Sequence, residues 1–290
     1  MSESAEGVDA TDAVDGSFEW NGHRLAYGDY GSGERVLVLM HGLLMNRHMF
    51  DRIAPEMASR GYRVITIDTL GHGASDRPDD MRLYSMPAFG EQLAALIDHL
   101  ELDRPVIGGT SLGANAALEF GVAFPGKARG LLVEMPVLDN ALLGAALAFT
   151  PMLLGLRFGQ PILRPLSAVL RRVPRTSLLV DVGLDWLRQD PGPSRSVLEG
   201  ILFHRTAPPH SERVGITDPA LVIGHPSDPL HPFSDAGMLV EEVESARLVD
   251  ANSILEWRLT PGRLDDILEE FLAECYATQP SSRPKKPSLA

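Results

Sequence analysis

Cysteine is almost absent from the sequence: Cys275 is the only one in 290 residues. No disulfide can form within the chain, and a single thiol fits a reducing compartment such as the cytoplasm. The cysteine pairs and the H-E-x-x-H pattern that are typical of zinc sites are missing as well. We therefore expect a cytoplasmic protein with no metal and no cofactor. A chain of this length can be stabilised by its hydrophobic core alone.

Basic residues are outnumbered, because 26 Lys and Arg stand against 39 Asp and Glu, and the formal net charge is −13. A nucleic-acid-binding protein presents a basic face to the phosphates, so this balance argues against a nucleic-acid partner. The start of the chain lacks the basic and apolar segments of a secretory signal. Residues 1–16 and 279–290 are rich in small and polar residues, and we expect them to be disordered tails.

No apolar run reaches the ~20 residues that a membrane-spanning helix needs. The longest run, 141–156, contains Pro151, and we interpret it as a buried or cap helix. Arg157, Arg164 and Arg171 recur at seven-residue spacing, a pattern that would suit an anionic group or lipid headgroups. Prolines lie between these arginines, so we favour a solvated face and do not expect membrane contact. The sequence makes no prediction of oligomeric state.

The sequence does contain a regular alternation of strand and helix patterns. Short apolar runs typical of buried strands occupy residues 35–40, 62–68, 105–110, 128–135, 220–224 and 246–249, with helical patterns between them. A hairpin around Asn21-Gly22 precedes them. This alternation predicts an α/β fold, in which a mostly parallel central sheet has helices on both faces.

The alternation stops between residues 136 and 214, where no strand pattern occurs. We interpret this stretch as a helical cap, inserted between core segments 17–135 and 215–278. The cap is expected over the carboxyl edge of the sheet, where ligands bind in such folds. Because the stretch is rich in apolar residues, we expect the partner to be an apolar small-molecule substrate.

The strongest functional signal is the G-x-S-x-G pattern of residues 109–113, which lies between a predicted strand and a predicted helix. A tight turn at this place holds the serine in a strained conformation and exposes its hydroxyl above the sheet. Residues larger than glycine would clash two positions to either side. We therefore predict that Ser111 is a nucleophile.

A second signal is His41-Gly42-Leu43-Leu44, directly after the 35–40 strand. The glycine permits a sharp turn, so that the backbone N–H of Leu43 can point at a reacting oxygen beside the N–H of Leu112. Two such donors would form an oxyanion hole. We interpret His41 as an orienting residue and not as the base.

A third signal, D-x-x-G-H-G-x-S-D at residues 68–76, completes a set. The three motifs in this order resemble the N-terminal half of the α/β-hydrolase family, and the resemblance extends over residues 17–276. It implies an α/β-hydrolase fold with a serine nucleophile. It also implies that the histidine of the third motif, His72, is structural.

The resemblance further implies an acid after a late strand, in a G-x-x-x-D arrangement that Asp228 matches, or at the end of the strand before the cap, which is Glu134. It also implies a histidine after the last strand. Residues 250–261 occupy that place and contain no histidine. A serine is a poor nucleophile without a base, so the base must come from elsewhere if the protein is a catalyst.

Three sources of a base are open. The favoured one is His231, on the same predicted loop as Asp228. The others are a carboxylate with a raised pKa, Glu134 or Glu256, and a histidine of the cap, His204 or His210. The predicted function is a serine hydrolase that acts on an ester or related acyl bond of an apolar small molecule. The alternative is a catalytically impaired protein of the same fold that binds a small apolar ligand. A peripheral-membrane protein is the third reading.

Overall fold

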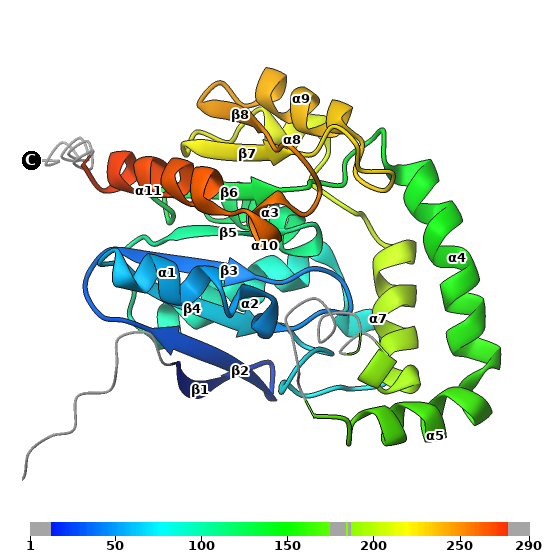
Figure 1. Cartoon of the computed structure of the whole chain (residues 1–290). Coiled ribbons are helices and arrows are strands. Elements are labelled where there is room, and N and C mark those ends of the chain that lie inside the picture. The colour runs from blue at the N-terminus through cyan, green and yellow to red at the C-terminus, as the bar shows by residue number, and fades with distance from the viewer. Residues whose placement is uncertain (1–12, 175–183, 185–186, 278–290) are drawn as a thin grey trace, which may run out of the picture.

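A computed structural model of the chain describes residues 13–174, 184 and 187–277. Its strands form a single sheet in the order β1-β2-β4-β3-β5-β6-β7-β8 (Figure 1). The strands from β3 to β8 run parallel, and β2 is antiparallel to both β1 and β4. The predicted α/β architecture is confirmed. The strands are β1 (Val14–Trp20), β2 (His23–Tyr30), β3 (Val36–Met40), β4 (Arg63–Asp68), β5 (Val106–Thr110), β6 (Gly130–Glu134), β7 (Ala220–Gly224) and β8 (Ala246–Asp250).

Helices cover both faces of this sheet and create two hydrophobic cores (Figure 1). One core lies under α2, α3 and α9, and the other under α1 and α11. Every residue of β3, β5, β6 and β7 is buried, which explains why each reads as a continuous apolar run. The helices of the two layers are α1 (Ile53–Ser59), α2 (Met86–His99), α3 (Leu112–Ala123), α9 (Phe233–Glu242) and α11 (Gly262–Ala277).

Two local expectations need correction. The expected tail 1–16 ends too late, because β1 begins at Val14 and pairs with β2 from Val14 opposite Asp29. The first residues of this edge strand are exposed, so no apolar pattern announces them. Residues 1–12 and the expected tail 279–290 lie outside the described part of the chain. The helical pattern after β3 is in fact a 3-10 helix, η1 (Arg47–Phe50), followed by the separate α1.

Helices lie between β6 and β7, within the segment predicted to form a cap, and four of them are described over their whole length. They are α4 (Leu142–Phe158), α5 (Gln160–Leu170), α7 (Pro191–Phe203) and α8 (His210–Arg213). Figure 1 shows α4, α5 and α7 beyond the carboxyl ends of the parallel strands. Two short elements complete the described chain, η2 (Met81–Leu83) and α10 (Glu256–Leu259).

Of the two alternatives expected for the run 141–156, a buried or a cap helix, the structure does not support the buried one. The run forms most of α4, and within that helix only Ala145 is buried. No single helix among the described residues is both long and apolar enough to cross a membrane. Taken together, α4 and α5 would pass by length and composition, but they are bent by 94°.

Candidate active site

Ser111 lies at the turn from β5 to α3, with backbone angles φ 56° and ψ −107°. A positive φ is costly for a residue other than glycine, and the surrounding packing holds this one in place. At this turn, the backbone of residues 109–113 passes very close to the carbonyl oxygen of Met40. A Cβ atom at Gly109 would lie 2.1 Å from that oxygen, and one at Gly113 would lie 1.9 Å from it. Both glycines of the motif are therefore required by space.

The imidazole of His231 reaches the serine. Its Nε2 lies 2.9 Å from Ser111 Oγ, and its Nδ1 lies 2.8 Å from Asp228 Oδ2. Ser111 follows β5, and the other two residues share the loop between β7 and α9. The side chains thus form a continuous hydrogen-bonded row from carboxylate to hydroxyl.

The chemistry of Asp228 fixes the direction of these hydrogen bonds. An ionised carboxylate can only accept, so His231 Nδ1 carries a proton and donates it. Nε2 of the neutral ring is then an acceptor for the hydroxyl proton of Ser111. This is the tautomer that a general base needs.

The pKa of Asp228 lies below its ordinary value, so the carboxylate is ionised at neutral pH. Burial alone would raise this pKa. The hydrogen bond and charge of His231, together with two backbone N–H groups, outweigh burial because they favour the charged form. The N–H groups of Leu230 and His231 donate to Asp228 Oδ1 at 2.8 Å and 3.1 Å. The same bonds fold the loop into a tight turn that fixes the histidine.

Leu43 and Leu112 supply the backbone N–H groups that the sequence assigns to an oxyanion hole. Both residues line the same cavity as Ser111. In the described part of the chain, neither N–H donates a hydrogen bond to another protein group. Leu112 is also the first residue of α3, where a helix leaves its N–H groups free. Two free donors at this place suit a developing negative charge.

His41 and His72 are buried next to the segment after β3 that contains Leu43, and their hydrogen bonds hold this segment in place. His41 Nδ1 donates to the Gly42 carbonyl at 2.8 Å, and His41 Nε2 accepts from the Thr69 N–H at 3.2 Å. His72 Nε2 accepts from the Leu44 N–H at 3.1 Å. Burial lowers the pKa of both histidines, so both rings are neutral. The geometry fits the orienting and structural roles expected of them.

Glu134, the alternative acid or base, has other partners. Its carboxylate forms an ion pair with Arg258 at 3.0 Å and accepts a hydrogen bond from the Thr110 hydroxyl, and His225 Nε2 lies 3.4 Å away. Burial would raise its pKa, but the Arg258 charge and the His225 contact lower it to about 2. A carboxylate so acidic is a poor base. In the described residues no hydrogen bond joins it to His231.

Arg258 is a site-supporting residue that sequence reasoning missed. It lies in the stretch where the family resemblance places a histidine, and its guanidinium binds the acid at the end of β6. The carbonyl of that same Glu134 accepts the N–H of Ser111 at 2.8 Å. The ion pair therefore anchors the backbone beside Ser111. The sequence offered no local signal for this pair, because Glu134 and Arg258 are 124 positions apart.

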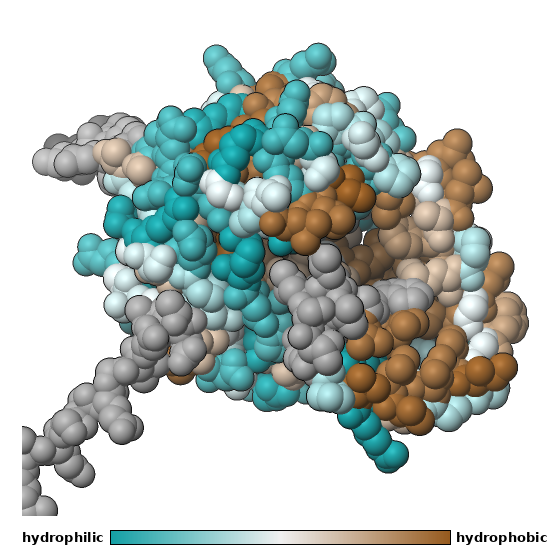
Figure 2. Space-filling view, viewed as in Figure 1, coloured by the Kyte–Doolittle hydropathy of each residue, from teal (hydrophilic) through white to brown (hydrophobic). Residues whose placement is uncertain are grey.

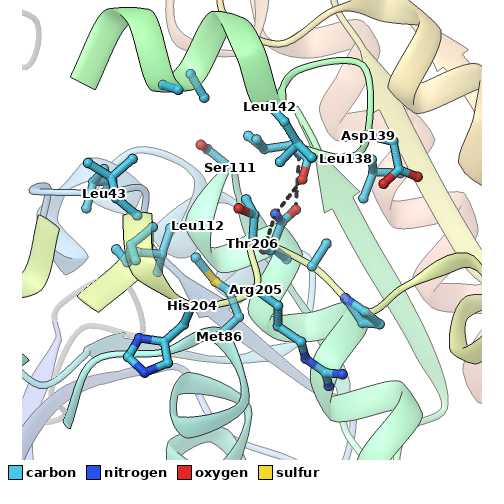
Figure 3. Close-up of a pocket in the computed structure, with 18 of the residues that line it drawn as sticks. Leu43, Met86, Ser111, Leu112, Leu138, Asp139, Leu142, His204, Arg205 and Thr206 are labelled. Atoms are coloured by element: carbon cyan, nitrogen blue, oxygen red, sulfur yellow. Dashed lines mark hydrogen bonds between the residues drawn. The ribbon is translucent and has the colours of Figure 1, made fainter. Parts of the chain in front are cut away.

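The remaining base candidates are also occupied elsewhere. Glu256 binds Arg263 and Asn252, and His210 binds Glu242 on the surface. His204 lines the cavity, and its Nδ1 donates to the Gly200 carbonyl at 2.6 Å. Its ring lies well away from Ser111 (Figure 3).

Ser111 opens into a cavity of about 540 Å³ between the sheet edge and the inserted helices (Figure 3). Its wall is mostly aliphatic and aromatic. The apolar lining residues include Leu43, Met86, Leu138, Leu142, Phe149 and Ile201. The cavity is large enough for a small organic molecule and would bury an apolar one.

The charged groups of this cavity are already paired. Arg205 binds Glu119 and Glu212, and Arg213 binds Glu242 and Asp139. An anionic ligand would have to compete with these carboxylates for the guanidinium groups. Among residues 13–174, 184 and 187–277, no group of three or more His, Cys, Asp or Glu side chains is placed to hold a metal ion.

Comparison with known proteins agrees with this geometry. A family model described as the alpha/beta hydrolase fold matches residues 35–161. An uncharacterized protein of Mycobacterium tuberculosis is 36% identical over 105 residues, which are 36% of this chain. The match spans only 30% of the length of that relative. The AB hydrolase superfamily protein YisY of Bacillus subtilis is 26% identical over 245 residues, 78% of this chain and 86% of YisY.

Solved structures extend the likeness to nearly the whole fold. The enol-lactonase from Burkholderia xenovorans superposes with a TM-score of 0.72, over 89% of this chain and 100% of that one. The sequence identity of the pair is 22%, so this likeness concerns the fold. The sheet and these matches show that the chain has the α/β-hydrolase fold, and the family model covers residues 35–161 of its 290.

Proposed function

We propose that this protein is a serine hydrolase that cleaves an ester, lactone or related acyl bond of an uncharged, apolar small molecule. Ser111 is the nucleophile, His231 the general base and Asp228 the acid that orients the base. The backbone N–H groups of Leu43 and Leu112 bind the oxyanion. The observation that carries the proposal is the 2.9 Å contact from His231 Nε2 to Ser111 Oγ.

In the first half of the proposed reaction, His231 Nε2 takes the hydroxyl proton as Ser111 Oγ attacks the acyl carbon. The carbonyl oxygen becomes an anion and is held by the two N–H donors. The ionised Asp228 stabilises the imidazolium. His231 then returns the proton to the leaving alcohol, and an acyl-enzyme on Ser111 remains. Water, activated by the same imidazole, releases the acid and restores the serine.

The alternative function, ligand binding without turnover, rested on the missing histidine after the last strand. That argument loses its force because His231 meets Ser111 from another loop. The loop also delivers its histidine already oriented by a carboxylate. These contacts support the catalytic reading over the impaired one.

Two observations support an uncharged apolar substrate. The cavity beside Ser111 has a mostly apolar wall, and its arginines are paired with carboxylates. The fold neighbour from Burkholderia is named an enol-lactonase, and a lactone is a cyclic ester. We therefore place esters and lactones first among the substrates to test.

The test is hydrolysis of a panel of p-nitrophenyl esters and simple lactones by the whole chain and by Ser111→Ala. We expect saturable turnover by the parent protein and a loss of about 10⁴-fold or more in the variant. The variant must remain folded by circular dichroism. Ligand binding by both proteins, with no turnover by either, would favour the alternative function.

A further inference from the structure

The inserted helices α4 and α5 expose an unusual amount of apolar surface. Figure 2 shows hydrophobic residues gathered over these two helices on one side of the molecule. Large apolar side chains are normally exposed singly, so a continuous patch of them points to contact with something else. We call this patch the α4–α5 surface. Its exposed members are Leu142, Leu143, Leu147, Leu154, Phe158, Ile162, Leu166 and Val169.

The charge of the same segment is opposite to that of the whole protein. Residues 141–180 contain five arginines and no acidic residue, whereas the chain carries a net charge of −13. Arg157, Arg164 and Arg172 are exposed around the apolar side chains. Arg157 forms an ion pair with Glu199 at 3.6 Å, while Arg164 and Arg172 form no ion pair within the described residues.

In place of the solvated face that the sequence favoured, we propose that the α4–α5 surface lies on a lipid bilayer that contains anionic headgroups. An apolar face rimmed by arginines binds such an interface because both burial and charge favour it. The shape also fits. The 17 residues of α4 give a rod of about 25 Å, and the 94° bend into α5 spreads the contact in a plane.

Charge also decides between a bilayer and a second copy of this chain. In a twofold dimer built on the same surface, the arginines of one copy would meet those of the other. Like charges brought together at an interface cost free energy. An anionic bilayer instead supplies the negative charge that this segment of the chain lacks.

The docking surface has a consequence for the cavity, and this step rests on the proposed hydrolase function. Leu142, Ala145, Ala146 and Phe149 of α4 line the cavity that contains Ser111. A bilayer under α4 would therefore lie against one wall of that cavity. Apolar acyl substrates dissolved in the bilayer would reach Ser111 along this helix.

The test is flotation of the whole chain with two kinds of vesicle, one of phosphatidylcholine and one with about a third phosphatidylglycerol. We expect binding to the anionic vesicles that weakens with added salt. The double variant Leu147→Glu with Phe158→Glu, at side chains 68% and 73% exposed, should bind at least about tenfold more weakly. Val14→Glu, on the far edge strand and 58% exposed, is the matched control and should bind like the parent.

A second pair of variants tests the charge. Arg164→Glu with Arg172→Glu should abolish the preference for anionic vesicles, while Arg35→Glu, just before β3 at the amino ends of the parallel strands, should not. No flotation by the folded parent would overturn the proposal. So would a dimer in light scattering that the Leu147→Glu, Phe158→Glu variant dissociates without any vesicle binding. Ser111→Ala should bind the vesicles like the parent protein. Vesicle binding therefore tests the docking surface alone, and a failure of the hydrolase proposal would not affect its result.

Discussion

At the scale of single residues, the proposed base and its acid are close in sequence as well as in space. Asp228 and His231 are three residues apart, and the carboxylate accepts the N–H of His231 at 3.1 Å and contacts its ring at 2.8 Å. The pair is therefore pre-oriented by one turn of the loop. Only the contact with Ser111 depends on the packing of distant segments.

The buried ion pair between Glu134 and Arg258 gives a prediction about pH. The pKa of Glu134 is about 2 in the folded protein, against an ordinary value of 4.5. A depressed folded pKa adds stability that is complete above the unfolded pKa and is lost as the pH falls through the folded pKa. We expect Glu134→Gln to lower the free energy of unfolding by on the order of 3 kcal/mol at pH 7.

The measurement is urea unfolding of parent and variant at neutral pH and at several values between about 4.5 and 2. The difference between the two proteins should shrink across that window, because the parent loses its ionised carboxylate there. Asp266→Asn is the control, since Asp266 is 73% exposed in its pair with Arg60 and should matter little. A difference that stays constant with pH would show that the lost contact is not electrostatic.

Some residues of the candidate site could be predicted from sequence and others could not. Ser111 is announced by a turn that needs glycine on both sides, and Asp228 by its place after a strand. Arg258 was missed because its partner lies 124 positions away. No local pattern carries a contact of that range.

At the scale of elements, the turn from β5 into α3 depends on a close approach to β3. A methyl group at Gly113 would lie 1.9 Å from the Met40 carbonyl oxygen, which belongs to a rigid central strand. We expect Gly113→Ala to lower the free energy of unfolding by about 3 kcal/mol or more. Thermal or chemical unfolding measures this directly.

Gly144 in α4 provides the matched control for that substitution. A Cβ there meets nothing within 4 Å, and the residue is helical. Gly144→Ala should leave stability unchanged or raise it by up to about 1 kcal/mol, because alanine favours a helix. Equal losses in both variants would contradict the close-approach argument.

Asn115 connects helix α3 to the chain that covers the cavity. Its amide donates to the carbonyls of Val137 and Thr206, each at 2.8 Å, and its oxygen accepts the Val137 N–H at 3.1 Å. Asn115→Ala leaves these buried groups unpaired and loosens the cavity wall. We expect KM for an ester to rise about tenfold, with a smaller change in kcat.

Steady-state kinetics on the best ester of the panel separates the two effects of Asn115→Ala. Asn140→Ala, on the exposed turn before α4, is the control for an asparagine removed nearby. If kcat fell and KM stayed constant, Asn115 would act on the reacting atoms and not on the cavity wall.

Strands could be predicted from the sequence where burial of both faces makes every residue apolar. The central strands are apolar throughout because both faces of the sheet are covered. The start of β1 was not predictable, because its residues 14 and 15 are exposed and backbone pairing alone holds them. For the run 141–156 the sequence left a buried and a cap helix open, and its apolar composition could not show that α4 is mostly exposed.

At the scale of the whole molecule, charge is distributed unevenly. The whole chain carries a net charge of −13, whereas its segment 141–180 is basic and the arginines of the cavity are paired with carboxylates. An anionic substrate would approach a protein of net negative charge and would have to displace those carboxylates from Arg205 or Arg213. A neutral substrate avoids both effects.

We therefore expect neutral acyl esters to be preferred over esters of the same length that end in a carboxylate. The ratio of kcat/KM should be about tenfold or more in favour of the neutral ester, and should narrow as salt is added. Competition kinetics with a matched pair of esters measures it. Preference for the carboxylate ester would show that Arg205 or Arg213 exchanges its partner for the substrate.

Labelling with a fluorophosphonate probe tests whether His231 activates Ser111. The intact mass of the protein shows how much probe has reacted. Parent protein should gain one adduct per chain. Ser111→Ala should gain none, and His231→Ala should react at least about 10³-fold more slowly while staying folded. His204→Ala, at the far side of the cavity, should label like the parent. Labelling of His231→Ala at the parent rate, or no labelling of folded parent protein, would contradict the account.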